Sequence, residues 1–359
     1  MEILVKTIRG MEPIVASLIE DLIPESKCVA KPKGFLGLVL VSTSLDVKDA
    51  SNLINLGLPE AEKVIPIYAS CRAKIDEIVK NAANIARENI LSTEKFAVRT
   101  TRRGRHEFTS IDVNVRVGEA VRKATGASVD LEFPDKIVWV EIIGEKAYIS
   151  VTSGSIEYKK LNLGKPLLGE FTKSLIIGQI PYTGPIDAAE NMGRRIGRAM
   201  QTFEVGELVL TPVSTINAFE MYYFLKGLFE GIESRYRIQK KTYNRYVHKV
   251  PVSIENLYLF VRRNRDKPII VTSTKGKAIC DVADKIYDIF TQNKKVIVLI
   301  GAREGIPTGI FRFSDLVVDL APTITISTDY AGVATVIALI TILEKMGYFE
   351  RYKGKKATE

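Results

Sequence analysis

Two short polar segments near the C-terminus carry residue types that suit a small-ligand site. The first is GAREG, residues 301–305, whose two glycines let the backbone approach a bound molecule closely. The second ends in Ser327, Thr328 and Asp329, which are types that commonly begin a helix. A plain strand–helix–strand unit with glycine-rich turns has the same spacing, so spacing alone leaves both interpretations open.

Buried strands must position these two segments. The apolar run from Val296 to Ile300 is short and β-branched, which is typical of a strand buried on both faces of a parallel sheet. A second apolar run extends from Leu316 to Leu320, and an apolar helix pattern continues to Met346. Ligands bind at the carboxyl ends of the strands in open α/β sheets, so loops 301–307 and 321–330 have the position of a shared ligand site, which the plain strand–helix–strand interpretation leaves empty.

The segment 294–347 resembles the C-terminal half of a SPOUT methyltransferase. Gly301, Glu304, Gly305, Ile306 and Pro307 match the family's strand–Gly–x–x–Glu–Gly loop. Ser327, Asp329 and the small-residue helix 331–338 match its second motif, with Asp where many members have Asn. The resemblance implies an α/β SPOUT domain with a mostly parallel sheet and a trefoil knot around the cofactor S-adenosylmethionine.

A third stretch, ENMGRRIGRAMQTFEVGELVL at 190–210, resembles the first motif of SPOUT ribose 2′-O-methyltransferases. Arg198 aligns with the motif arginine, whereas Asn191 lies one residue further from Arg198 than the usual spacing. The alternative for Arg194, Arg195 and Arg198 is a basic helix face that binds phosphate without chemistry.

The same resemblance implies the roles of individual residues. The implied catalytic residues are Arg198, Glu304, Ser327 and Asp329. The implied cofactor-binding residues are Thr272, Ser273, Thr274, Ile300, Gly301, Gly305, Ile306, Leu320, Pro322, Ile326, Ser327 and Ala331. An arginine is a poor base because its guanidinium stays charged, so Arg198 is better suited to stabilising a developing alkoxide.

Several elements lie between these motifs. We predict strands at 174–180, 207–213, 257–262 and 268–271, a helix at 187–202 and an aromatic-rich helix at 216–239. The stretch from Arg235 to Lys249 mixes basic residues with tyrosines, which is the composition of a surface that follows a nucleic-acid strand.

The first 151 residues show the pattern of a different module. Residues 1–70 read strand, helix, strand, strand, helix, strand, which is the order of a ferredoxin-like domain. From Phe96 to Ser110 the chain carries F-x-V-R-x-x-R-x-G-x-H-x-F-x-S, followed by a helix at 112–124 and a hairpin at 137–151. This stretch closely resembles a THUMP domain, and the resemblance implies that it grips the single-stranded acceptor end of tRNA.

The basic residues of this stretch support RNA binding independently. We predict a strand at 96–100 and then a basic turn from Thr101 to His106 with almost no acidic residue inside it. Arginines neutralise phosphates and stack on unpaired bases. The predicted RNA contacts are Lys95, Arg99, Arg102, Arg103, Arg105, His106, Arg194, Arg195 and Arg245. The alternative is a solvated charged loop, which the cluster disfavours.

Composition excludes several classes of protein. The chain has 359 residues, a net charge of +9 and 46% hydrophobic residues, which fits a globular protein with a polyanionic partner. Its longest uncharged apolar stretch is too short to span a membrane and its N-terminus lacks a signal-peptide pattern, so we expect a cytoplasmic protein. Three scattered cysteines and two histidines offer no metal site.

Missing motifs exclude other enzymes that carry THUMP modules. The chain has no Asn/Asp-Pro-Pro-Tyr of a Rossmann-type base methyltransferase and no Ser-Gly-Gly-x-Asp-Ser loop of a thiouridine synthetase. It also lacks the His-x-Glu and Pro-Cys-x-x-Cys motifs of a deaminase and a Walker A loop.

The resulting prediction is an α/β protein with a ferredoxin-like domain at 1–70, a THUMP domain at 71–157, a linker at 158–171 and a SPOUT domain at 172–349. The resemblance implies a homodimer that methylates a ribose 2′-OH in the tRNA acceptor stem, at cytidine 6. The alternatives are a tRNA base methyltransferase on the same fold and a non-catalytic RNA-binding protein.

Overall fold

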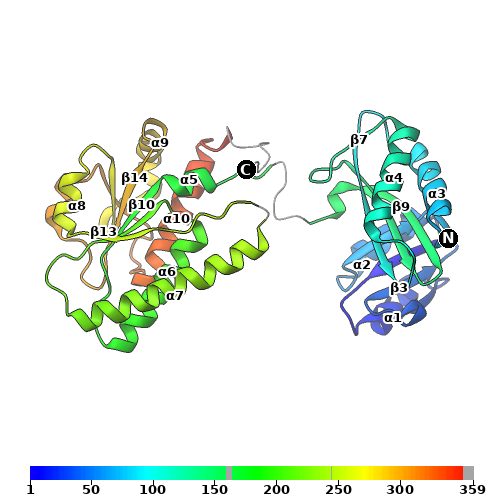
Figure 1. The fold of residues 1–359 in the computed structure, drawn as a ribbon, viewed down its shortest axis with the longest axis horizontal. Coiled ribbons are helices and arrows are strands. Elements are labelled where there is room, and N and C mark those ends of the chain that lie inside the picture. Colours follow the sequence, from blue (N-terminus) through cyan, green and yellow to red (C-terminus); the bar gives the residue numbers. More distant parts are fainter. Residues whose placement is uncertain (159–163, 244, 351–359) are drawn as a thin grey trace. The chain divides into compact units, whose positions relative to one another are not determined.

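The computed structural model describes residues 1–158, 164–243 and 245–350. The chain divides into two compact units, residues 1–162 and 163–359 (Figure 1). Residues 159–163 of the predicted linker lie outside the described residues.

The first sheet of the N-terminal unit has the predicted ferredoxin-like order. Strands β1 (Glu2–Lys6), β2 (Lys27–Ala30), β3 (Leu38–Ser42) and β4 (Lys63–Ile67) form an antiparallel sheet in the order β2-β3-β1-β4. Helices α1 (Glu12–Leu22) and α2 (Val47–Gly57) bury one face each against this sheet. Apolar residues alternate along the strands and recur at helical spacing in the helices, as the sequence pattern predicts.

The second sheet of this unit carries the THUMP motif. Its order is β5-β9-β8-β6-β7, from β5 (Ala69–Arg72), β6 (Lys95–Arg103), β7 (Ser128–Val129), β8 (Lys136–Ile143) and β9 (Lys146–Ser153). Helices α3 (Ile75–Asn89) and α4 (Ser110–Thr125) pack on it. The predicted turn at 101–106 is partly wrong, because β6 continues to Arg103 and pairs with β8 residue by residue up to Ile143.

A shared apolar layer joins the two sheets of the N-terminal unit. Leu4, Leu38 and Ile65 of the first sheet pack with Ile137 and Trp139 of the second. At the edge of this layer the ammonium of Lys63 lies 4.3 Å from the centre of the Trp139 ring. The ferredoxin-like and THUMP parts therefore form one packed body.

The C-terminal unit is built on a six-stranded parallel sheet in the order β12-β11-β10-β14-β13-β15. Its strands are β10 (Leu175–Gln179), β11 (Glu207–Leu210), β12 (Val252–Ile254), β13 (Ile269–Ala278), β14 (Val296–Ile300) and β15 (Leu316–Asp319). As predicted, β14 is buried along its whole length, because it lies between β10 and β13.

Helices cover both faces of this sheet. They are α5 (Gly169–Ser174), α6 (Ile186–Phe203), α7 (Ala218–Thr242), α8 (Leu257–Arg263), α9 (Ala283–Gln292) and α10 (Thr328–Lys345), which appear around the sheet in Figure 1. The helices predicted at 187–202, at 216–239 and up to Met346 are present as α6, α7 and α10. None of the described helices has the length and apolar character needed to cross a membrane.

Helices α6 and α7 approach each other through glycines. A methyl group on Gly197 would lie 2.1 Å from the Leu228 carbonyl oxygen, and one on Gly227 would lie 1.9 Å from the Glu190 carbonyl oxygen. Gly193 of α6 and Gly231 of α7 approach the backbone of the opposite helix equally closely. The two helices therefore pack backbone against backbone, which fixes where the arginines of α6 point.

One predicted strand is wrong. Residues 257–262 form helix α8 instead, beginning after Asn256, whose side-chain oxygen accepts a hydrogen bond from the Tyr258 amide at 3.1 Å. Leu257, Phe260 and Val261 are buried, which is helical spacing. A short apolar run fits either a strand or a helix, and here the side-chain cap favours the helix.

Candidate functional site

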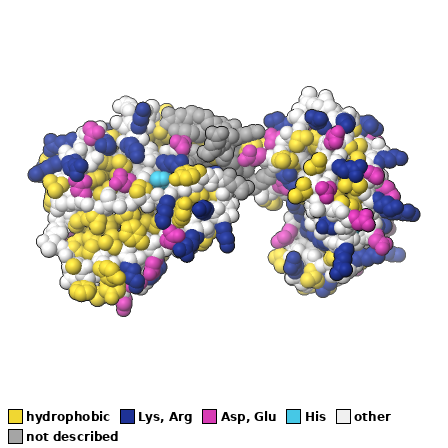
Figure 2. Space-filling model, in the orientation of Figure 1, with side chains coloured by type: hydrophobic (Ala, Val, Ile, Leu, Met, Phe, Trp, Pro, Cys, Tyr) yellow, Lys and Arg dark blue, Asp and Glu magenta, His cyan; other side chains and the backbone are white. Residues whose placement is uncertain are grey.

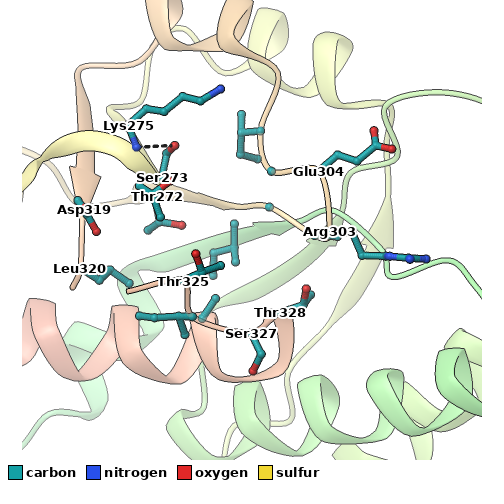
Figure 3. A pocket seen from close by; sticks show the side chains of 18 of the residues that line it. Thr272, Ser273, Lys275, Arg303, Glu304, Asp319, Leu320, Thr325, Ser327 and Thr328 are labelled. Atoms are coloured by element: carbon teal, nitrogen blue, oxygen red, sulfur yellow. Dashed lines mark hydrogen bonds between the residues drawn. The ribbon is translucent and has the colours of Figure 1, made fainter. Parts of the chain in front are cut away.

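Three loops near the carboxyl edge of neighbouring strands line one cavity in the C-terminal unit. One is the irregular stretch 272–275 inside β13, where the pairing with β15 shifts register between Thr272 and Lys277, and the other two follow β14 and β15. The cavity has a volume of about 450 Å³ (Figure 3). Its lining residues from these loops lie within 272–275, 300–306 and 319–328. The parallel register of the sheet brings these loops together, since every carboxyl end lies at the same edge.

Most of the predicted cofactor-binding residues line this cavity. They are Thr272, Ser273, Thr274, Ile300, Gly301, Gly305, Ile306, Leu320, Ile326, Ser327 and Ala331, and the predicted catalytic residue Glu304 joins them. Pro322, Asp329 and Arg198 are not among the lining residues. Figure 3 shows Asp319 and Leu320 on one side of the cavity and Arg303 and Glu304 on the opposite side.

Backbone contacts hold the loop after β14 in shape. The buried amide of Gln179 donates to the carbonyl oxygens of Ile180 at 2.9 Å and Gly301 at 3.3 Å. Gly301 has no room for a side chain, because an added methyl would lie 2.7 Å from the Cα of Gly305. Gly305 has φ of 75°, a conformation that favours glycine. The cavity wall is therefore a tight turn braced from β10.

The start of α10 is organised around Asp329. Ser327 occupies the N-cap position, but its hydroxyl donates to Oδ1 of Asp329 at 2.7 Å and makes no cap bond to the helix backbone. Arg195 of α6 donates to Oδ2 of the same carboxylate at 3.1 Å. Burial acts to raise the pKa of Asp329, but the hydrogen bonds from Ser327 and Arg195 outweigh it, so the pKa is lowered.

Arg198 points away from this network. Its guanidinium donates to the Ser234 hydroxyl on α7 at 3.1 Å, and the side chain is exposed. Arg195, three residues earlier, is the α6 arginine that lies beside the start of α10. Position 195 was predicted only as an RNA contact, because sequence spacing does not reveal which turn of α6 faces α10.

The sequence prediction missed several residues that line the cavity. Among them are Tyr182, Met192, Arg303 and Asp319. Tyr182 lies in the loop after β10, and Asp319 ends β15. The rule that ligands gather at the carboxyl ends of parallel strands was the available signal for both.

Acidic residues from distant parts of the chain pair with the basic cluster of the THUMP sheet. Arg99 donates to Glu157 at 3.1 Å, and Arg103 donates to the buried Glu141 at 2.9 Å. Lys6 also pairs with Glu141, and Lys95 lies 3.5 Å from Asp130. The cluster contains almost no acidic residue along the sequence, but in the folded structure acidic residues from elsewhere in the chain pair with several of its members.

Two other members of the cluster contact each other. Arg102 lies 3.4 Å from Nδ1 of His106, whose Nε2 lies 2.7 Å from the carbonyl oxygen of Gly144. Arg105 is exposed and has no ion-pair partner among the residues that the structure describes.

The predicted RNA contacts on the C-terminal unit are held by carboxylates. Arg194 donates to Glu190 and Glu230, each at 2.7 Å. Arg245 donates to the buried Glu204 at 2.6 Å and stacks 4.9 Å from the centre of the Tyr243 ring. Both arginines therefore have a structural partner in the absence of RNA.

No group of three or more metal-ligating side chains gathers among the described residues. The cavity instead offers hydroxyls, backbone groups and apolar side chains in a volume suited to a small organic ligand.

Family models match both halves of the chain. Residues 72–152 match the THUMP domain, and residues 169–359 match the AF2226-like SPOUT RNA methylase fused to THUMP. An uncharacterized protein of Methanocaldococcus jannaschii is 38% identical over 94% of this chain and 93% of its own length. A probable tRNA sulfurtransferase of that organism is 34% identical over 39% of this chain, which spans 38% of the relative.

Solved structures that resemble this one include a protein of Pyrococcus horikoshii, which is 17% identical over 96% of this chain and 99% of its own length with a TM-score of 0.37. Another is TrmN from Thermus thermophilus, 17% identical over 84% of this chain and 89% of its own length with a TM-score of 0.35. The second family model covers more than half of the chain, so the protein belongs to the AF2226-like SPOUT RNA methylases fused to THUMP, whose methyl donor is S-adenosylmethionine.

Proposed function

We propose that this protein methylates a ribose 2′-OH in the acceptor stem of tRNA, at the cytidine of position 6. The observation that carries the proposal is the convergence of three loops of the parallel sheet on one cavity, in a chain whose other unit contains a THUMP domain. The ribose target and the nucleotide follow from the family resemblance. We place this activity in the cytoplasm.

The cavity has the properties that the cofactor needs. Apolar side chains of Ile300, Leu320 and Ile326 suit a flat adenine, and backbone groups around Gly301 suit its polar edge. Thr272 and Ser273 place hydroxyls on the same wall, where they suit the ribose or amino-acid part. Gly301 packs directly against the backbone of Gly305, so only glycine fits in the turn that forms this part of the cavity wall.

Bound S-adenosylmethionine supplies an electrophilic methyl group. The chain must then hold a ribose 2′-OH in line with that group and orient its proton, which is mainly a positioning task. Glu304 is an exposed carboxylate at the cavity and is our candidate to accept that proton. Arg195, anchored by Asp329, presents a cation that suits the backbone of the same nucleotide.

We assign Arg198 to a second chain's cavity. Its guanidinium faces Ser234 on α7 and not the cavity of its own chain, so a catalytic role requires a neighbouring subunit. The proposed homodimer provides one. Phe219, Tyr222 and Phe229 of α7 and Tyr330 of α10 are large exposed apolar residues, and Figure 2 shows hydrophobic side chains gathered on the face where α7 lies.

The N-terminal unit is proposed to hold the tRNA. Relatives named as tRNA sulfurtransferases share part of this chain, and the exposed Arg105 lies in the THUMP motif. A domain that grips the 3′ end acts as a ruler, which makes a target at a fixed distance along the acceptor stem geometrically sensible.

Mass-spectrometric mapping of tRNA tests the proposal. Host tRNA from cells with and without the protein is digested, and methylated nucleosides are identified and located. We expect a 2′-O-methylated cytidine in the acceptor stem only when the protein is present. A methylated base at that place instead supports the base methyltransferase.

Calorimetry with S-adenosylmethionine separates the third candidate, a non-catalytic RNA-binding protein. The proposal expects saturable binding in the cavity, which Ala331→Phe should abolish by filling it. Absence of binding to the unaltered protein would favour the non-catalytic alternative.

A further inference from the structure

The cavity has a second wall that the cofactor contacts proposed above do not use. Tyr182 comes from the loop after β10, Met192 from α6, and Arg303 from the loop after β14. In Figure 3 Arg303 extends away from Thr272 and Asp319, on the opposite side of the cavity.

Tyr182 and Arg303 form a pair of planar groups on this wall. The Arg303 guanidinium lies 5.7 Å from the centre of the Tyr182 ring. Gly184 makes room for the pair, because a methyl group there would lie 3.3 Å from the ring and 3.6 Å from the guanidinium. Pro181 and Pro185 bracket the loop, and the second of them occupies the N-cap position of α6, so the ring is carried on a stiff support.

The charge of this pair is not neutralised by the protein. Among the residues that the structure describes, Arg303 has no carboxylate partner, and its side chain is exposed. This distinguishes it from Arg194, Arg195 and Arg245, whose guanidinium groups each contact a carboxylate. An unpaired guanidinium beside an aromatic ring is the arrangement on which unpaired nucleobases stack.

We propose that Tyr182 and Arg303 form a stacking site for an unpaired nucleobase of the RNA substrate, at the mouth of the methyl-donor cavity. The inference rests on the proposed function, because it assumes that the RNA reaches this cavity. Stacking removes the base from its helix and brings the attached ribose toward the cavity floor. The ligand class is therefore a nucleotide that is unpaired when bound, and the site has no requirement for one base identity.

Binding of unfractionated tRNA in the presence of S-adenosylhomocysteine tests the inference without turnover. Tyr182→Ala should weaken tRNA binding by about 5- to 150-fold, because base stacking contributes about 1–3 kcal/mol. Its salt dependence should stay unchanged, since stacking releases no counterions. Tyr182→Phe should bind like the unaltered protein. Arg303→Lys keeps the positive charge but removes the planar guanidinium group. We therefore expect weaker tRNA binding with an unchanged dependence of affinity on salt concentration.

The chain offers matched controls. Arg265 lies 5.0 Å from the centre of the exposed Phe313 ring, and Tyr258 is an exposed tyrosine of α8, and neither lines the cavity. Arg265→Ala and Tyr258→Ala should leave tRNA affinity within about twofold, the range of an ordinary surface substitution.

The outcomes separate the two proposals. The stacking site is wrong if Tyr182→Ala binds tRNA as tightly as the unaltered protein. It is also wrong if Tyr182→Phe loses as much tRNA affinity as Tyr182→Ala. Either result stands against the site even where methylation is detected. If the unaltered protein methylates no RNA but Tyr182→Ala still weakens binding selectively, the methyltransferase activity is wrong and the stacking site stands.

Discussion

At the residue scale, Asp329 links helix α10 to helix α6 and contacts Ser327, which lines the cavity. Its carboxylate accepts hydrogen bonds from Ser327 and Arg195, so the start of α10 is tied to α6. The carboxylate is nearly buried, whereas the Arg195 side chain is 66% exposed. The acid is therefore the fixed member of the pair, and the arginine remains accessible to a ligand.

Asp329→Asn should destabilise the protein by about 1–3 kcal/mol at neutral pH, because it weakens charge-assisted hydrogen bonds. The lowered pKa of Asp329 means that its contribution is present above the ordinary carboxyl pKa of about 4 and is lost as pH falls through the folded value. Urea unfolding at pH values from 7 to 3 should thus show the two proteins converging in acid. Asp266→Asn, on an exposed side chain, should change stability by less than about 0.5 kcal/mol at neutral pH.

Arg103 and Arg105 are neighbours in the motif but should behave differently. Arg105→Ala should weaken tRNA binding and reduce the slope of log affinity against log salt by about 0.7–0.9 for each phosphate that the arginine had neutralised. Arg103→Ala leaves the buried Glu141 with Lys6 alone, so it should lower the free energy of unfolding by about 1.5–3 kcal/mol. Salt titrations and thermal melts of both variants measure these effects. Equal changes in stability would contradict the assignment.

At the element scale, the glycine contacts between α6 and α7 set the direction of the α6 side chains. Gly193 and Gly197 let the α7 backbone come close on one side. Met200 meets Gly332 of α10 on another, where a methyl group would lie 2.7 Å from the Met200 side chain. The helix is held between two neighbours, so Arg195 and Arg198 point to different places although they are three residues apart.

Gly197→Ala should destabilise the C-terminal unit by about 1–3 kcal/mol, because the new methyl group would push the helices apart. Gly118→Ala is the matched control, since Gly118 is inside α4 and its methyl would meet only Val98 at an ordinary 3.8 Å. There we expect stability to stay equal or rise by up to about 1 kcal/mol, the usual gain of alanine over glycine in a helix. Chemical denaturation followed by circular dichroism makes the comparison.

Elements with strong periodicity agree with the sequence prediction, and one with weak periodicity does not. Strand β14 and helices α6 and α10 have long or uniform apolar patterns, and each lies where it was predicted. The short apolar run at 257–262 fits both a strand and a helix, and the hydrogen bond to the side chain of Asn256 favours the helix. A helix cap depends on the side chain of a single residue, so the spacing of apolar residues does not predict it.

At the scale of the whole molecule, the proposed homodimer makes a prediction about shared sites. Arg198→Ala and Ala331→Phe should each abolish methyl transfer, but for different reasons. If Arg198 serves the partner's cavity, a mixed dimer of the two variants has one complete site. Refolding an equal mixture should then restore about a quarter of the unaltered activity, since half of randomly assorted symmetric dimers are mixed.

The control is a mixture assembled without exchange of subunits, which should stay inactive. An inactive refolded mixture that contains mixed dimers would contradict the assignment of Arg198 to the partner's cavity. Activity is measured as methyl transfer to bulk tRNA, and native mass spectrometry is used to monitor the exchange of subunits.

The family and the cofactor were available from the sequence through a resemblance carried by local motifs, and the same resemblance pointed to the residues of the three cavity loops. The spacing of the glycines and N-cap types alone left the presence of a ligand open. The sequence did not reveal the partners of the basic residues. Glu141 and Glu157 are separated from Arg103 and Arg99 by 38 and 58 positions, and only sheet pairing and packing bring them together.

The orientation of the α6 arginines was likewise decided by the tertiary structure. Helical spacing places Arg195 and Arg198 on one side of an isolated helix, but the contacts of α6 with α7 and α10 determine which neighbour each one meets. Tyr182 and Arg303 are 121 positions apart (303 − 182) and lie in one cavity because β10 and β14 are adjacent parallel strands. Motifs of nearby residues can be recognised in the sequence, whereas contacts between distant residues depend on the strand order of the folded sheet.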